Sequence, residues 1–287
     1  MSILHFVVFS LIALFVVNLL CPRKQGQPLP GPSPLPIIGN LHQAPSSYPE
    51  RVYHEWSKKY GPIFKLQYAQ QKIIMLSNFE VAKDLLDKRS AIYSNRPHLP
   101  MFTDLVGKGH HIIFMPYNDG YRTRKRLQES FLNHKASQSY TVVQDVESKQ
   151  VLYDLLSSND FHHQFYRYTS SILFALGYGK RLPRGDEPES SAVAQVMRNL
   201  VAAGKVGTWM CDAIPQLNYI PTFLAPWKKW AEEIFQFESR VLRENYDYGM
   251  STSTWNWCKQ TSEKPEAKAL PLIDLTYNIG NVYEVRA

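Results

Sequence analysis

The sequence predicts a mainly α-helical protein with a small β-hairpin near its start, preceded by a transmembrane helix. Three features support this prediction. An uncharged apolar run opens the chain, two short β-prone segments lie between residues 63 and 76, and apolar residues recur at helical spacing from residue 119 onwards. Hydrophobic residues make up 44% of the chain and charged residues 20%, which excludes a disordered, collagenous or coiled-coil protein.

Residues 1–21 are predicted to form a transmembrane anchor. Only His5, Ser10 and Asn18 interrupt the apolar run, and a helix over residues 3–21 would be about 28 Å long, close to the thickness of a bilayer core. No basic residue precedes the run and no small-residue cleavage site follows it, which favours an uncleaved anchor over a signal peptide. The basic residues at positions 23 and 24 predict a cytosolic body by the positive-inside rule.

Residues 22–45 are predicted to form a proline-rich hinge. Five prolines occupy alternate positions from Pro28 to Pro36, and each restricts its own backbone and that of the residue before it. We therefore expect an extended, stiff strut that fixes how the next domain faces the lipid. A generic spacer and a ligand for SH3-type domains are the alternatives.

Residues 46–287 are predicted to form the body. Ser47 to Glu50 resembles a capping box, and the helix that it begins ends at Gly61. Residues 63–68 and 72–76 form the predicted hairpin, and residues 77–80 offer a second helix cap. The main helices are then expected over Asp119–Asn133, Ser137–Ser157, Phe161–Leu176, Ser190–Gly204, Ala225–Asp247 and Pro271–Tyr283.

The net charge bears on the class of partner, and the cysteine content and histidine spacing bear on the class of protein and of site. The net charge of +7 permits an acidic protein or an anionic membrane, but the basic residues are spread along the chain and do not favour nucleic acid. Three cysteines in 287 residues exclude a disulfide-stapled secreted scaffold. The histidine pairs at 110–111 and 162–163 are adjacent, which is not the spacing of metal ligands on one helix face.

Several short motifs follow one another in a specific order. The strut PLPGP…PIIGN leads to KYGP at residues 59–62, the hairpin, YSNRP at 93–97 and MPY at 115–117. In this order they resemble the N-terminal half of a microsomal cytochrome P450, a membrane-anchored haem-thiolate monooxygenase. RYTSS, YGKR, LAPW and NW, which begin at residues 167, 178, 224 and 256, are similar to segments of fungal members that tailor secondary metabolites.

The resemblance covers about residues 4–283 and implies an incomplete cytochrome P450 fold. It also implies haem as the cofactor, NADPH-cytochrome P450 reductase as a partner, and the endoplasmic reticulum membrane as the location. The substrate would be a hydrophobic secondary metabolite, into which the family inserts one oxygen atom from dioxygen. The family's variable substrate loop would lie around residues 101–113.

Of four motifs on which the family's chemistry rests, the helical W-x-x-x-R motif alone has a counterpart. Tyr121 stands in place of the Trp and Lys125 in place of the Arg, and the resemblance assigns both to a haem propionate. A solvated basic helix face is the alternative. Arg122, Arg124 and Arg126 would serve the acidic reductase electrostatically.

The other three motifs are missing from the sequence. Cys21, Cys211 and Cys258 do not lie in F-x-x-G-x-R-x-C-x-G, and no Glu has an Arg three positions later. Residues 274–284 resemble the start of the family's central helix, but Val285, Arg286 and Ala287 replace the oxygen-binding motif. The sequence therefore predicts no catalytic residue, no metal ligand and no stably bound haem. A retained intron, a disrupted gene or a frameshift would produce this ending.

Three functional hypotheses remain open. The first is a truncated, inactive relative of a cytochrome P450 monooxygenase. The second is a partial gene model of an active monooxygenase of that class. A weaker third is a membrane-tethered binding module without catalytic activity.

Overall fold

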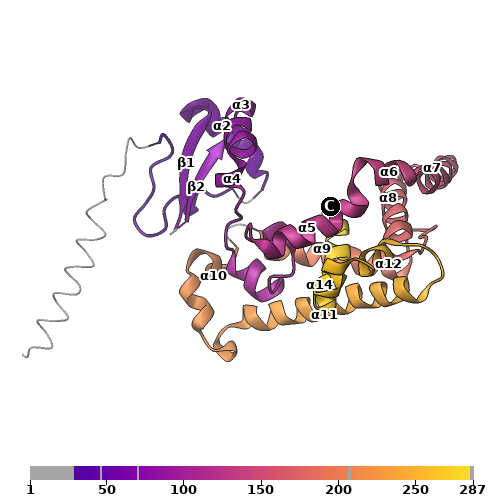
Figure 1. Cartoon of the computed structure of the whole chain (residues 1–287). Coiled ribbons are helices and arrows are strands. Elements are labelled where there is room, and N and C mark those ends of the chain that lie inside the picture. Colours follow the sequence, from indigo (N-terminus) through magenta and orange to yellow (C-terminus); the bar gives the residue numbers. More distant parts are fainter. Residues whose placement is uncertain (1–28, 46, 70, 206–207, 285–287) are drawn as a thin grey trace, which may run out of the picture. The chain divides into compact units, whose positions relative to one another are not determined.

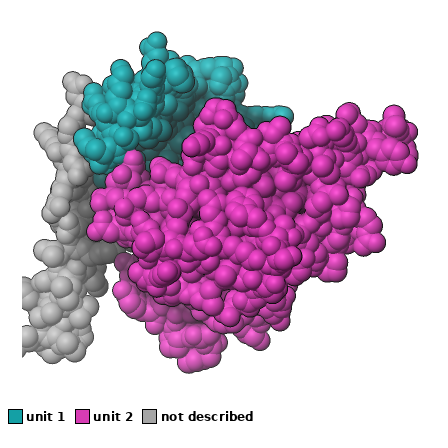
Figure 2. Space-filling model, turned by 45° about the vertical axis from the view of Figure 1, so that its right-hand side comes forward, with its two compact units in different colours: residues 1–93 teal, residues 94–287 magenta. Residues whose placement is uncertain are grey.

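The computed structural model describes residues 29–45, 47–69, 71–205 and 208–284 (Figure 1). The predicted anchor at residues 1–21 lies outside the described residues. Within the described ranges, no helix is both long and apolar enough to cross a bilayer. The chain divides into two compact units, residues 1–93 and 94–287, which Figure 2 colours separately.

The first unit contains the predicted hairpin. Strands β1 (Ile63–Tyr68) and β2 (Gln71–Leu76) are antiparallel, with Ile63 opposite Leu76. Phe64 and Leu66 of β1 are fully buried, as the alternation of apolar and polar residues predicts. The hydroxyl groups of Tyr53 and Tyr68 lie 2.9 Å apart and tie α2 (Pro49–Tyr60) to the sheet.

The two helix caps predicted in this unit have different outcomes. The capping box at residue 47 is wrong: α2 follows Tyr48, which has a left-handed backbone and makes no side-chain cap. Pro49 takes the first helical position instead, where its fixed φ suits a helix and its missing N–H costs nothing. The second cap is confirmed, because Asn78 accepts hydrogen bonds from the first N–H groups of α3 (Phe79–Ala82). A 3-10 helix (Leu41–Gln43), a π-helix (Lys83–Lys88) and α4 (Ser90–Tyr93) complete the described part of the unit.

From residue 35 onwards, the hinge is not the extended strut that the prolines predict. Pro30 lies along β1, where its carbonyl accepts a hydrogen bond of 2.8 Å from the Lys65 amide. The chain then turns back between Leu35 and Gly39, which exchange backbone hydrogen bonds. Gly39 has a φ of 61°, and a Cβ there would lie 2.2 Å from the Gln67 carbonyl oxygen. The prediction of a stiff strut is therefore wrong from residue 35 onwards.

The second unit is helical, as predicted. Its longer helices are α5 (Asp119–Leu132), α7 (Thr141–Leu155), α8 (Phe161–Tyr178), α9 (Pro188–Gly204), α11 (Pro226–Ser251) and α14 (Leu272–Glu284), and the short helix α6 (His134–Ser139) lies between α5 and α7 in the sequence. Shorter elements are α10 (Met210–Ala213), α12 (Trp257–Ser262), α13 (Pro265–Lys268), a π-helix (Met101–Val106), and 3-10 helices over Ile112–Phe114, Pro215–Tyr219 and Thr222–Leu224.

The helix predicted over residues 137–157 is in fact two helices, α6 and α7, which meet at Tyr140. The Tyr140 side chain is buried, donates to the Phe131 carbonyl at 2.8 Å and accepts from the Trp257 indole at 3.0 Å. These two partners hold the ring inside the core, and the helix is interrupted at this residue.

Two larger hydrophobic clusters and a small one, of Phe235, Leu242 and Tyr277, form the core of this unit. One of the larger clusters contains Trp257 stacked on Phe131, and α14 contributes Ile279 and Tyr283 to it. The Tyr283 hydroxyl packs against α8 at Gly177, where a Cβ would lie 2.4 Å from that oxygen. The other larger cluster joins the π-helix, α9 and α11, and α11 also contacts α14, which crosses it in Figure 1.

Candidate functional site

Helix α5 carries both predicted haem-propionate residues on one face. Asn118 caps the helix by accepting a hydrogen bond of 2.9 Å from the Tyr121 amide. Lys125 follows four positions later, so its side chain lies beside that of Tyr121. Tyr121 is half-buried, with its ring 5.5 Å from that of Tyr117, while Lys125 is exposed and lies 3.8 Å from Glu129. Their assignment to a propionate stays a prediction.

Arg124, on the same helix, points into the protein. Its guanidinium forms a buried ion pair with Asp274 of α14 and donates to the Gly109 carbonyl at 3.2 Å. The expectation that Arg124 serves an acidic partner is therefore wrong. Arg122 and Arg126 are exposed, as that role requires. The sequence contains a signal for this burial, because Arg124 lies three positions before Leu127 and therefore on the same, buried face of the helix.

The Asp274 carboxylate binds two side chains, those of His110 and Arg124. His110 Nδ1 lies 2.6 Å from Asp274 Oδ1, and Arg124 pairs with the same carboxylate. Burial by itself would raise the pKa of Asp274, but the hydrogen bonds from Arg124 and His110 outweigh it and hold the pKa below its ordinary value. The carboxylate therefore remains ionised at neutral pH.

A cavity of about 770 Å³ lies beside this cluster, within the second unit. Its apolar wall includes Phe102, Phe114 and Met115, and its polar wall includes Arg96 and His111. The cavity lies in the segment where the resemblance predicts the substrate loop. Its volume and mixed wall suit a small organic molecule with a large apolar part.

The described cysteines do not fit the role of a haem-iron ligand. Cys211 and Cys258 are both buried and free. Burial, with a smaller contribution from the Asp212 charge, raises the pKa of Cys211 to about 11. Burial raises the pKa of Cys258 still further above its ordinary value, and its thiol donates to the Gly177 carbonyl at 3.2 Å. A cysteine that binds haem iron must be an ionised and accessible thiolate. The thiols of Cys211 and Cys258 meet neither condition.

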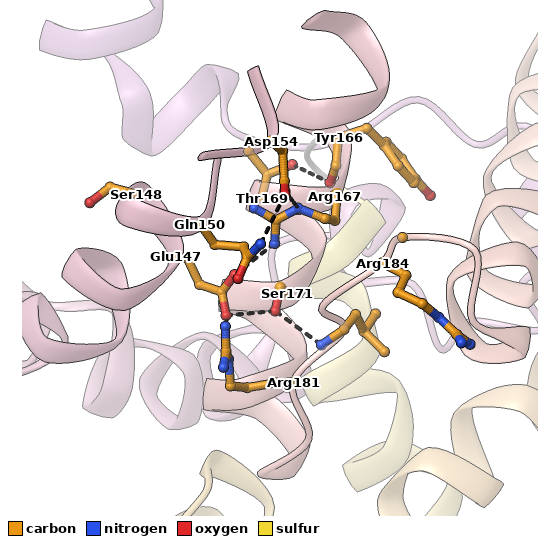
Figure 3. Close-up of polar contacts among 12 residues, drawn as sticks. Glu147, Ser148, Gln150, Asp154, Tyr166, Arg167, Thr169, Ser171, Arg181 and Arg184 are labelled. Atoms are coloured by element: carbon orange, nitrogen blue, oxygen red, sulfur yellow. Dashed lines mark hydrogen bonds and ion pairs between the residues drawn. The ribbon is translucent and has the colours of Figure 1, made fainter. Parts of the chain in front are cut away.

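A second group of charged side chains converges on Glu147 of α7 (Figure 3). Glu147 is fully buried and accepts hydrogen bonds from Arg181 at 2.6 Å, Arg167 at 2.8 Å and Ser171 at 2.9 Å. Burial by itself would raise the pKa of Glu147, but these three donors lower it below the ordinary value. The Ser171 hydroxyl in turn accepts from the Leu182 amide at 3.0 Å.

This group braces the protein and does not resemble a catalytic centre. Arg167 and Ser171 belong to α8, so Glu147 ties α7 to α8 and to the segment that follows α8. Arg184 points away from the carboxylates in Figure 3 and pairs with Asp186 at 3.1 Å. Among the residues that the structure describes, no three His, Cys, Asp or Glu side chains group as a metal site.

Comparison with known proteins identifies relatives along most of the chain. The family model "Cytochrome P450" matches residues 29–261. Cytochrome P450 monooxygenase aneD of Aspergillus aculeatus is 37% identical over 266 residues, which are 92% of this chain and 52% of that protein. Cytochrome P450 monooxygenase drtD of Aspergillus calidoustus is 36% identical, over 95% of this chain and 52% of its own length. Cytochrome P450 monooxygenase FrzL of Cladobotryum sp. is 35% identical, over 91% and 51%. The chain spans about half the length of these curated relatives.

Proposed function

Because the chain belongs to the cytochrome P450 family, we propose that it is an inactive relative of the fungal monooxygenases of secondary metabolism and corresponds to their N-terminal half. By itself this 287-residue polypeptide holds no stable thiolate-ligated haem and has no monooxygenase activity. One observation carries this proposal: Cys211 and Cys258 are buried thiols with raised pKa values and do not fit an iron ligand. Cys21 belongs to the predicted anchor.

The chain contributes the predicted anchor and the cavity of the substrate loop. Residues 1–21 would hold it at the endoplasmic reticulum membrane with its body in the cytosol. Phe102, Phe114 and Met115 offer apolar contacts to a hydrophobic metabolite, and Arg96 supplies a polar one. Tyr121 and Lys125 would approach a haem propionate only where further parts of a cytochrome P450 domain supply the haem pocket.

The alternative is that this sequence is part of a complete, active enzyme. That enzyme would insert one oxygen atom from dioxygen into a hydrophobic secondary metabolite, with electrons from NADPH-cytochrome P450 reductase. The relatives support this alternative, since the part of each relative that matches this chain is about half of that protein's length.

A free-standing binding module is the weaker alternative. The cavity favours it, but Val142, Leu152 and Leu156 of the α7 region are 74%, 64% and 85% exposed. Apolar side chains exposed to this degree favour association or aggregation over a stable free module.

The first experiment is a carbon-monoxide difference spectrum of reduced microsomes that contain the 287-residue chain. Microsomes with full-length aneD serve as the positive control. We expect the thiolate-type Soret band from the control alone. A thiolate-type band from the chain would overturn the proposal, and Cys211→Ser and Cys258→Ser would then identify the ligand.

A second experiment separates an inactive relative from a partial sequence. The transcript and the genomic DNA are sequenced past the codon for Ala287. An in-frame oxygen-binding motif, Glu-x-x-Arg pair and cysteine loop would establish a complete enzyme. Their disruption by stop codons would establish an inactive relative.

A further inference from the structure

His110 and His111 are adjacent in the loop of residues 107–111, which lines the cavity, and each binds a different helix. His110 Nδ1 lies 2.6 Å from Asp274 Oδ1 on α14. His111 Nε2 lies 3.3 Å from Glu238 Oε2 on α11. A carboxylate accepts, so the ring N–H donates in both contacts, through a different nitrogen in each histidine.

The His111–Glu238 contact is fully buried, and the His110–Asp274 contact is largely buried, with side chains 20% and 11% exposed. The side chains of His111 and Glu238 are 2% and 1% exposed. The His111 ring meets Phe102 and Tyr277 edge-on, with ring centroids 5.2 Å away in each case. His110 also packs on Tyr277, at 5.2 Å. Removing either donor would deprive a buried carboxylate of a hydrogen bond that water does not replace.

Two further contacts tie the segment around the histidines to α14 and α11. Asn281 of α14 donates to the His110 carbonyl at 3.3 Å, and the Lys108 ammonium pairs with Glu232 of α11 at 2.7 Å. Lys108 and Gly109 have φ values of 43° and 77°, a left-handed turn that is unfavourable for a lysine. Such a turn persists where surrounding contacts over-determine it.

We propose that His110 and His111 are positioning residues, which fix the loop 107–111 as a wall of the cavity. His110 acts through Nδ1 and His111 through Nε2. Gly107, Lys108, Gly109 and His111 all line the cavity, so the two anchors set its shape and therefore the ligands that fit. The choice of ligand rests on the proposed function, whereas the anchoring itself needs neither haem nor substrate.

Amide substitutions test which ring nitrogen matters. The side-chain amide of Asn places its N–H near the position of histidine Nδ1, and that of Gln places it near Nε2. Hydrogen–deuterium exchange of the full chain in detergent micelles is followed in peptides that cover residues 101–115. We expect H110N and H111Q to keep near-native protection, and H110Q and H111N to exchange about tenfold faster or more.

The exposed His134 provides matched controls, since H134N and H134Q should leave the loop unchanged. Equal protection in the Asn and Gln variants of either histidine would overturn the proposal, as would the reverse order. Imidazole ¹⁵N chemical shifts of the wild-type chain, at a pH where histidine is neutral, give a second test that needs no variant. A proton on Nε2 of His110, or on Nδ1 of His111, would contradict the proposal.

Nile red binding then separates this inference from the proposed function. Faster exchange in H110Q and H111N with unchanged dye affinity would confirm the anchors but contradict their control of ligand fit. An appearance of the thiolate-type Soret band would overturn the proposed function and leave the exchange result standing.

Discussion

Arg124 and Asp274 form a buried ion pair that joins α5 to α14, two helices from opposite ends of the second unit's sequence. Arg124 also donates to the Gly109 carbonyl, and His110 binds the same Asp274 carboxylate, so the pair contacts two residues of the loop 107–111. The pair is therefore a structural centre of the candidate ligand site, and it is the first target for mutation.

Arg124→Met should destabilise the protein strongly. It leaves Asp274 as a buried charge that His110 alone compensates, and breaking a buried pair costs about 3 kcal/mol or more. The free energy of unfolding in urea measures this loss. Lys125→Met is the matched control on the exposed face of α5 and should change it by less than about 0.5 kcal/mol. Equal effects of the two substitutions would contradict the buried role of Arg124.

Stability should fall in acid because two buried carboxylates have lowered pKa values. Asp274 and Glu147 bind protons less readily in the folded than in the unfolded protein. Their contribution is present above the ordinary carboxyl pKa and is lost as the pH falls through the folded values. Urea unfolding between pH 7 and pH 3 measures this slope.

The Glu147→Gln variant isolates one of the two contributions to this slope. Gln does not titrate, so the variant should be less stable at pH 7 and should lose less stability on acidification. Glu263→Gln, at an exposed site, controls for the charge change. An unchanged acid slope in Glu147→Gln would show that Glu147 does not contribute.

Cys211 and Cys258 should be unreactive in the folded protein. Their thiols are buried, and burial raises both pKa values, so the reactive thiolate is scarce at neutral pH. In a Cys21→Ser background, Ellman's reagent should therefore modify neither thiol until urea unfolds the chain. Rapid modification of one of them in the folded state would contradict its burial and weaken the argument against an iron ligand.

Replacing Asn278 by Leu should stabilise the protein. Asn278 is fully buried, and neither atom of its amide has a hydrogen-bond partner in the described structure. Leu has the same number and branching of side-chain heavy atoms, so removing the desolvated amide should gain about 1 kcal/mol. Thermal unfolding measures the difference.

Asn281, on the same helix, provides the opposite case. Its amide donates to the His110 carbonyl at 3.3 Å, so Asn281→Leu should lower the melting temperature. A rise in both variants, or a fall in both, would show that hydrogen bonding does not decide the effect at these two positions.

Strands and helices that depend on the local pattern of apolar and polar residues could be predicted from the sequence. The alternation from Ile63 to Tyr68 gives β1, and the apolar spacing after Ala225 gives α11, with limits close to those expected. The family resemblance was also readable, and the matched family model confirms it.

Features set by distant partners could not be predicted. Tyr140 divides a predicted helix because Phe131 and Trp257 hold its hydroxyl. The spacing of Arg124 from Leu127 indicates a buried face, but no local pattern identifies Asp274 as its partner. The proline-rich segment turns at Gly39 to meet β1. The adjacent histidines at 110 and 111 did not suggest metal binding, and no local pattern shows that each meets a carboxylate on another helix.

The place of Tyr283 in the core has a consequence for how the chain folds during synthesis. The hairpin pairs residues close in sequence, so it can form while the ribosome is still translating the second unit. The cluster around Trp257 needs Ile279 and Tyr283, which follow all its other buried members in the sequence. Until these residues leave the exit tunnel, helices α5 and α8 expose an unfinished apolar core to solvent. We therefore expect the second unit to be prone to aggregation until Tyr283 has joined its core.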